Sequence, residues 1–265
     1  MALRTLLGHR QDCMRSVRRW LSVERKVRPA LRLESGACGL PHPQKRATGG
    51  EDAWFISGNT VGVADGVGGW ARKGIDSGEY SRTLMNSAKR TVTATDKTPT
   101  PLQVLKVAHR SAQCPGSSTA CIVQLNDLSL QAINLGDSGF LLCRLQPDKL
   151  GFGANGDKPE MGEMYELETQ EGDMIVLGTD GLFDNLFPKQ IASLLDTVLP
   201  STPELGHHSM EKVASCIAHT AHKAAKGTKS KTPFAVAAQQ AGYEYLGGKM
   251  DDITVVTSLV TSDGA

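Results

Sequence analysis

Short apolar runs that border an aspartate recur along the chain. In Val61–Trp70, the run V-G-V-A leads into Asp65 and then into a glycine-rich stretch. Met174–Asp180 (M-I-V-L-G-T-D) and Leu130–Asp137 (L-Q-A-I-N-L-G-D) repeat this order, whereas Asp251–Val260 reverses it, with D-D before I-T-V-V-T-S-L-V. Apolar runs of this length that are rich in β-branched residues predict buried strands. The pattern therefore predicts strands that carry carboxylates at their ends.

Two of the predicted strands are adjacent in the sequence. Ala53–Ile56 and Thr60–Ala64 flank the S-G-N sequence at 57–59, a composition that favours the turn of a β-hairpin. Closing this hairpin brings Glu51 and Asp52 to the end of the pair where the second strand reaches its own aspartate. Three carboxylates are thus expected at the open end of one hairpin.

The remaining aspartates are expected to join this end of the hairpin. In an antiparallel pair, the end of one strand lies beside the start of its neighbour. Asp65 and Asp180 close their strands and Asp251 opens one, so we expect all three at one sheet edge. Crowded carboxylates repel one another and raise each other's pKa unless a cation neutralises them. A hard divalent ion with oxygen ligands satisfies this requirement, so the sequence predicts a metal site.

The rest of the chain predicts helices grouped between runs of strands. Tyr165–Leu167 and Met174–Leu177 are expected to form a hairpin that turns at Gln170–Asp173. This order of elements favours an α+β fold over alternating β-α-β units. Helices are predicted from Asp76 or Ser77, from Thr100-Pro101, and over Pro188–Leu199, Ser209–Ala225 and Pro233–Ala241; further strands are predicted over Thr119–Leu125, Leu130–Leu135 and Phe140–Arg144.

Composition narrows the possible partners and compartments. The 265 residues suffice for one large domain or two small ones. A formal net charge of +1 gives no reason to expect a nucleic acid or an anionic membrane as a partner. No apolar run approaches the ~20 residues needed to span a bilayer. The six cysteines form no C-x-x-C pair, so they indicate neither a zinc framework nor a disulfide scaffold.

The first part of the chain differs from the rest. Met1–Arg25 contains six arginines but only two acidic residues, and leucine, methionine, valine and tryptophan stand between the arginines. This composition is typical of an organelle transit peptide, with the mitochondrion favoured and a plastid as the alternative; a basic surface helix is the other interpretation. Val27–Gly50 has weak periodicity and predicts a linker. We therefore expect residues 1–35 to be a targeting segment with its linker and residues 36–262 to be the folded domain.

Six short motifs, in this order along the chain, resemble those of the metal-dependent type 2C protein phosphatases. The forms D-G-V-G-G-W and L-F-D-N-L resemble the organellar branch that contains the T-cell-activation phosphatase and its plant and fungal relatives. The family fold is a four-layer α-β-β-α sandwich, with two antiparallel sheets between helical layers, and this is the fold we expect. The motifs are Glu51-Asp52, A-D-G-V-G-G at 64–69, G-S-S-T-A at 116–120, G-D-S-G at 136–139, G-T-D-G-L-F-D-N at 178–185 and G-G-K-M-D-D-I-T at 247–254.

The resemblance implies an activity and a set of site residues. The implied enzyme is a monomeric serine/threonine phosphatase in which two Mn²⁺ or Mg²⁺ ions activate a hydroxide that attacks a phosphoserine or phosphothreonine of a protein. Asp65, Asp180 and Asp251 are the implied catalytic ligands. By the same resemblance, Asp65 bridges the two ions, Gly66 offers its carbonyl to one of them, and Asp180 and Asp251 bind the other. The resemblance also implies that Glu51 and Asp52 hold metal-bound waters and that Asp137 lies near an optional third ion. Arg46 is a candidate for binding the substrate phosphate.

The chain departs from the family pattern at residue 67 and in the stretch Arg144–Met164. Val67 stands where the family often has a histidine, a candidate general acid. The stretch Arg144–Met164 is shorter than the corresponding connection in relatives. This shortening supports the alternative that the chain is a catalytically impaired, phosphoprotein-binding regulatory module. A likeness of Gly178–Asp184 to the haloacid-dehalogenase loop is set aside, because Gly178 stands where that loop needs its nucleophilic aspartate.

Overall fold

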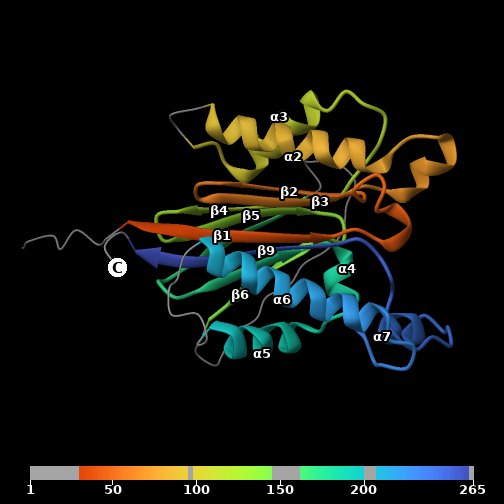
Figure 1. Cartoon of the computed structure of the whole chain (residues 1–265). Coiled ribbons are helices and arrows are strands. Elements are labelled where there is room, and N and C mark those ends of the chain that lie inside the picture. The colour runs from red at the N-terminus through yellow and green to blue at the C-terminus, as the bar shows by residue number, and fades with distance from the viewer. Residues whose placement is uncertain (1–29, 95–97, 145–161, 200–206, 263–265) are drawn as a thin grey trace, which may run out of the picture. The chain divides into compact units, whose positions relative to one another are not determined.

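Two antiparallel β-sheets lie face to face between helices that cover their outer surfaces (Figure 1). The computed structural model describes residues 30–94, 98–144, 162–199 and 207–262. The α+β fold with a four-layer sandwich is therefore confirmed. The segment 1–25, expected to be a transit peptide, and most of the stretch after Arg144, expected to be shortened, fall outside the described residues.

Each sheet collects strands from distant parts of the chain, and all of their pairings are antiparallel. The five-stranded sheet has the order β2 (Asp52–Ser57), β3 (Thr60–Asp65), β4 (Ala120–Asn126), β5 (Ser129–Leu135) and β7 (Glu163–Glu168). The four-stranded sheet has the order β1 (Leu31–Leu40), β9 (Ile253–Ser262), β8 (Met174–Gly178) and β6 (Gly139–Cys143). The helices are α2 (Ser77–Thr93), α3 (Pro101–Ser111), α4 (Asp180–Phe183), α5 (Pro188–Val198), α6 (His207–Ala225) and α7 (Pro233–Gln240), with 3₁₀ helices η1 (Pro43–Lys45) and η2 (Gly68–Lys73).

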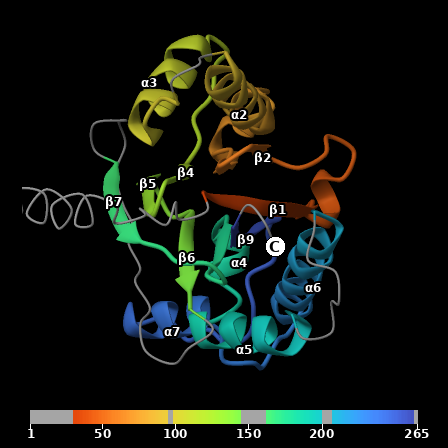
Figure 2. The ribbon, with the colours of Figure 1, turned by 90° about the vertical axis from the view of Figure 1, so that its left-hand side faces the viewer.

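Three hydrophobic cores separate the four layers. Helices α2 and α3 cover the five-stranded sheet, the two sheets pack on each other, and α5 and α6 cover the four-stranded sheet (Figure 2). Strand β8 shows why its sequence is apolar throughout. Met174 and Val176 belong to the core beneath the helices, whereas Ile175 and Leu177 belong to the core between the sheets. Since side chains alternate along a strand, a strand buried on both faces needs a continuous apolar run.

Local signals place the first two helices where the sequence predicts them. The Asp76 carboxylate accepts a hydrogen bond of 3.0 Å from the Gly78 amide and caps α2. Thr100 and Gln103 form a reciprocal capping box at the start of α3. Such caps satisfy amides that have no partner within the helix, so they define its first residue.

The prediction of a linker is wrong for Leu31–Leu40, which forms strand β1 and crosses the boundary expected at residue 36. Its ten residues pair with β9, more than 200 residues away in the sequence. Seven of its ten residues are small or polar, and α6 lies directly against the strand. A Cβ atom on Gly36 would come within 2.1 Å of the Glu211 amide nitrogen, so only glycine allows the helix to approach this closely.

The predicted hairpin of residues 165–177 is also wrong. The turn forms, and Asp173 accepts a 3.1 Å hydrogen bond from the Gln170 amide. The strands on either side nevertheless belong to different sheets, because β7 pairs with β5 whereas β8 pairs with β6 and β9.

Among the helices that the structure describes, none has the length and the apolar character required to cross a bilayer.

Candidate metal centre

The predicted carboxylates gather where the ends of both sheets meet. Asp65 is the last residue of β3 in the five-stranded sheet. Asp180 follows β8 and Asp251 precedes β9, and these two strands are neighbours in the four-stranded sheet. The expectation of a single sheet edge is therefore wrong, since the cluster is built from two stacked sheets. A hydrogen bond of 2.8 Å from the Thr179 hydroxyl to Asp52 Oδ2 joins them directly.

The first hairpin forms as predicted and brings its acids together. Asp52 pairs directly with Asp65 in the register of β2 and β3, and Glu51 is buried beside them. The Gly66 amide donates a 3.0 Å hydrogen bond to the Glu51 carbonyl. A Cβ atom on Gly66 would lie 2.3 Å from the Ser77 carbonyl oxygen, so the chain can pass here only as glycine.

The carboxylates lie too close together, and too far from water, to ionise freely. Burial, with the charges of Asp52 and Asp180 adding to it, raises the pKa of Asp65 to about 10. Burial raises the pKa of Asp52 to about 8, although the hydrogen bond from Thr179 acts in the opposite direction. Burial also raises the pKa of Asp180. Without a metal ion among them, some of these groups therefore hold protons at neutral pH.

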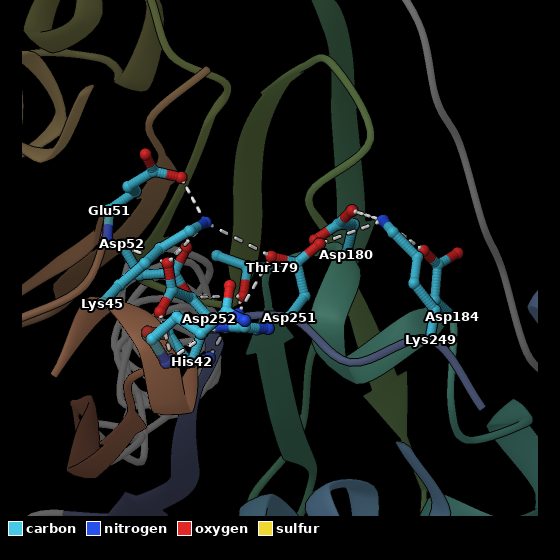
Figure 3. Close-up of polar contacts among 12 residues, drawn as sticks. His42, Lys45, Glu51, Asp52, Thr179, Asp180, Asp184, Lys249, Asp251 and Asp252 are labelled. Carbon is cyan, nitrogen blue, oxygen red and sulfur yellow. Dashed lines mark hydrogen bonds and ion pairs between the residues drawn. The ribbon is translucent and has the colours of Figure 1, made fainter. Parts of the chain in front are cut away.

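Lys45 inserts its ammonium group on one side of the cluster (Figure 3). It forms an ion pair with Glu51, lies 3.3 Å from Asp252 Oδ2 and lies 3.8 Å from Asp251 Oδ1. Burial alone would lower the pKa of Lys45, but the hydrogen bond to Glu51 and the charges of the three acids outweigh it and raise that pKa. Lys45 is therefore a fixed positive charge within the cluster.

Lys249 inserts its ammonium group on the other side of the cluster (Figure 3). Its ammonium group forms an ion pair with Asp180 and lies 2.8 Å from Asp184 Oδ2 and 3.2 Å from Asp251 Oδ2. Asp251 thus lies between the two lysines (Figure 3). Burial opposes the charge on Lys249, but Asp180 and Asp184 outweigh burial and raise the pKa of the lysine.

The remaining predicted site residues lie at the margin. Asp137 is exposed and lies near Asp184. Burial raises the pKa of Asp184, and the charges of Asp137 and Asp251 add to this effect, although Lys249 acts in the opposite direction. Arg46 is exposed and follows η1. Burial lowers the pKa of His222, and the charge of Arg46 adds to this effect, which locates Arg46 near α6. The cation that this segment contributes to the acidic cluster is therefore Lys45.

Sequence reasoning missed three groups that shape the site: the Asp252 carboxylate, the Lys249 ammonium group and the Thr179 hydroxyl. Asp252, only 2% exposed, accepts hydrogen bonds from the His42 and Glu51 amides and so anchors the segment before β2. For Asp252 and Lys249, the available signal was the alternation of side chains expected just before β9. Residues two apart, such as Lys249 and Asp251, would share one face, and Asp252 would lie on the other. The third group, the Thr179 hydroxyl, carries no signal in the sequence.

The donor set fits divalent metal ions. All of the acidic ligands offer oxygen, which hard cations prefer. Among the described residues, Oδ1 of Asp52 and Oδ1 of Asp180 are buried acceptors without a hydrogen-bond partner. Leaving such atoms unpaired is costly, so each is available to a cation. Among the described residues, no group of three His, Cys, Asp or Glu side chains forms a metal cage, and two lysine ammonium groups stand among the carboxylates.

Comparison with known proteins decides the family. No protein-family model matches the chain. The chain is 31% identical over 266 residues to probable protein phosphatase 2C 26 of Arabidopsis thaliana, with 89% of this chain and 86% of that protein covered. The chain belongs to the type 2C protein phosphatase family.

Other members extend this relationship. Probable protein phosphatase 2C 80 of Arabidopsis thaliana is 45% identical over 252 residues, which cover 88% of this chain and 60% of that relative. The chain therefore spans about 60% of that relative's length, and 52% of a second one that is 44% identical. The X-ray structure of the photosystem II phosphatase PBCP superimposes with a TM-score of 0.75 at 30% identity, covering 86% of this chain and 99% of that one. At 18% identity, the catalytic domain of the serine threonine protein phosphatase PstP, in complex with 2 manganese ions, shares the fold with a TM-score of 0.60.

Proposed function

We propose that the chain is a metal-dependent protein serine/threonine phosphatase that hydrolyses phosphoserine and phosphothreonine monoesters in proteins. The observation that carries the proposal is the convergence of Asp65, Asp180 and Asp251, from three distant segments, at the shared end of two sheets. Buried carboxylates that repel one another lower the stability of a protein without metal. A module that only binds phosphoproteins would have no use for them, so their presence in a type 2C family member favours the active enzyme.

The residues divide into ligands and groups that hold the ligands. Asp65, Asp180, Asp251 and the Gly66 carbonyl would bind two Mn²⁺ or Mg²⁺ ions. When bound, such ions lower the pKa of a water molecule and stabilise the negative charge that develops during displacement at phosphorus. Supporting hydrogen bonds keep the acids in place: Thr179 holds Asp52, and the carboxylate of Asp252 holds the backbone of Glu51.

The leaving oxygen needs a proton, and residue 67 has none to give. Val67 lies directly after Gly66 and is 47% exposed. An alkoxide is a poor leaving group, and a positioned general acid contributes roughly 10²–10⁴-fold to such a step. We propose that solvent water protonates the serine or threonine oxygen in this enzyme.

The test is phosphate release from a phosphothreonine peptide by the purified protein. We expect release with Mn²⁺, its loss on addition of a chelator, and its recovery when Mn²⁺ is restored. The Asp65→Asn variant serves as the matched control for metal-dependent turnover. Binding of the peptide without phosphate release in Mn²⁺ would show that the chain is a phosphoprotein-binding module instead.

A further inference from the structure

The backbone of Lys249 is clamped in place by one buried side chain. Asn185, only 2% exposed, accepts a 3.0 Å hydrogen bond from the Lys249 amide and donates one of 2.8 Å to the Lys249 carbonyl. The Lys249 ammonium group also lies 5.7 Å from the centroid of the Phe234 ring, within the range of a cation–π interaction. The lysine is therefore directed into the cluster by its surroundings and is not a mobile surface side chain.

The ammonium group of Lys249 meets three carboxylates, which matches its three hydrogen-bond donors. Two of them, Asp180 and Asp251, are proposed metal ligands. The third, Asp184, has no part in the proposed two-ion set and lies 2.8 Å from the lysine nitrogen. Asp184 is also the cluster carboxylate whose charge environment includes Asp137, the residue that the family resemblance associates with an optional third ion.

The contacts of Lys249 show what this lysine does. Its ammonium group lies among Asp180, Asp184 and Asp251 and supplies one positive charge to these three carboxylates. A divalent ion that bound Asp180 and Asp184 together would need the place that the ammonium group now fills.

We propose that the Lys249 ammonium group takes the place of a third metal ion, holding Asp184 beside Asp137 so that this phosphatase binds two divalent ions and no more. The inference rests on the proposed metal-dependent function. It makes Lys249 a positioning residue, because it acts through Asp184 and Asp180 and need not touch the substrate.

The experiment counts bound Mn²⁺ in the full chain, using electron paramagnetic resonance of the free ion during a titration to saturation. We expect two ions for the wild type, three for Lys249→Met and two for Lys249→Arg, which keeps the charge. The double variant Lys249→Met with Asp184→Asn should return to two, because it also removes the carboxylate released by the first change. Lys45→Met is the matched control: it removes an ammonium group of the same cluster and should leave the count at two.

Several outcomes would overturn the proposal. Three ions on the wild type would mean that Lys249 does not occupy an ion's place, and this result does not depend on any variant folding. Two ions on a folded Lys249→Met, even with tighter affinity, would mean that the lysine only competes with the two catalytic ions. A third ion on Lys45→Met would show a general effect of lost charge. No bound ion on the wild type would refute the proposed function as well, whereas three ions would leave it intact.

Discussion

Replacing Asp65 by asparagine should stabilise the metal-free protein while it removes activity. Burial and the charges of Asp52 and Asp180 raise the pKa of Asp65 to about 10. In the described part of the chain, the ion pairs of Lys45 and Lys249 reach other acids and not Asp65. Asparagine has nearly the same shape and no charge, so it relieves the repulsion without breaking an ion pair.

The magnitude follows from proton linkage. The folded-state pKa of Asp65 lies above its ordinary value of 3.8, so the cost to stability is absent at low pH and grows as the pH rises toward 10. pH 7 lies about 3 units above the ordinary pKa of 3.8, which sets an upper limit of roughly 4 kcal/mol on the free energy of unfolding that Asp65 costs at this pH. Partial exposure and shared protons with Asp52 and Asp180 reduce this to about 1–3 kcal/mol. For a domain of this size the gain corresponds to a rise in Tm of roughly 3–10 °C.

The assay is thermal unfolding in the presence of a chelator, at pH 7 and again at pH 4. Asp196→Asn, on the exposed face of α5, is the matched control for the loss of one carboxylate and should change Tm little. With Mn²⁺, Asp65→Asn should lose at least ~100-fold in kcat, because a bridging ligand charge is missing. A metal-free Tm below that of the wild type at pH 7, or an equal gain at both pH values, would refute the reasoning.

Four further outcomes are expected. Asp180→Asn should also lose at least ~100-fold in kcat with Mn²⁺ but gain little metal-free stability, since it breaks the ion pair with Lys249; calorimetry and kinetics measure both. The metal-free Tm of the wild type should fall as the pH rises from 4 through 8, because the folded-state pKa values of Asp52 and Asp65 are raised, and saturating Mn²⁺ should remove this fall; a rising Tm would contradict it. We propose that residues 1–25 direct the protein to a mitochondrion, or alternatively a plastid, and a fluorescent fusion that stays in the cytosol would count against this. Val67→His should raise kcat/KM for phosphopeptides relative to aryl phosphates and add an imidazole-like pH dependence; an unchanged ratio would mean that the proton comes from elsewhere.

The layers of the fold could be predicted because their signals are local. Met174–Gly178 is apolar throughout since both faces are buried, and the caps at Asp76 and Thr100 start α2 and α3 as expected. Strand pairing could not be predicted in the same way. Leu31–Leu40 owes its strand conformation to a partner more than 200 residues away and to the helix packed on it. No local period contains that information.

The connection between β7 and β8 shows the same limit. Its turn, closed by Asp173, was predictable from polar residues and a glycine. Whether the chain turns back on itself or crosses to the other sheet depends on which edge is free. The exposure of Glu163–Glu168 alternates, as suits the edge of the five-stranded sheet, whereas the next strand is fully buried between β6 and β9. Sheet edges are a property of the assembled fold, so the sequence pattern could not decide between these connections.

The carboxylates of the site were predictable because several acids at strand ends need a common cation. Their cationic partners were harder to find, since Lys45 and Arg46 are adjacent and only the turn of η1 decides which one faces the acids. Lys249 had a signal in its position two residues before Asp251, since residues two apart share a face where a chain is extended.

The two lysines explain how such a cluster can exist in a folded protein at all. Buried carboxylates that only metal could neutralise would oppose folding before metal binds. Lys45 and Lys249 supply part of the positive charge from within the chain and leave Asp65, the proposed bridging ligand, without one of their ion pairs. The remaining repulsion is concentrated where the ions are expected to bind, so metal binding and the completion of a stable site are coupled. A cluster neutralised fully by lysines would fold more readily but would bind no metal, and one without lysines would depend on metal to fold.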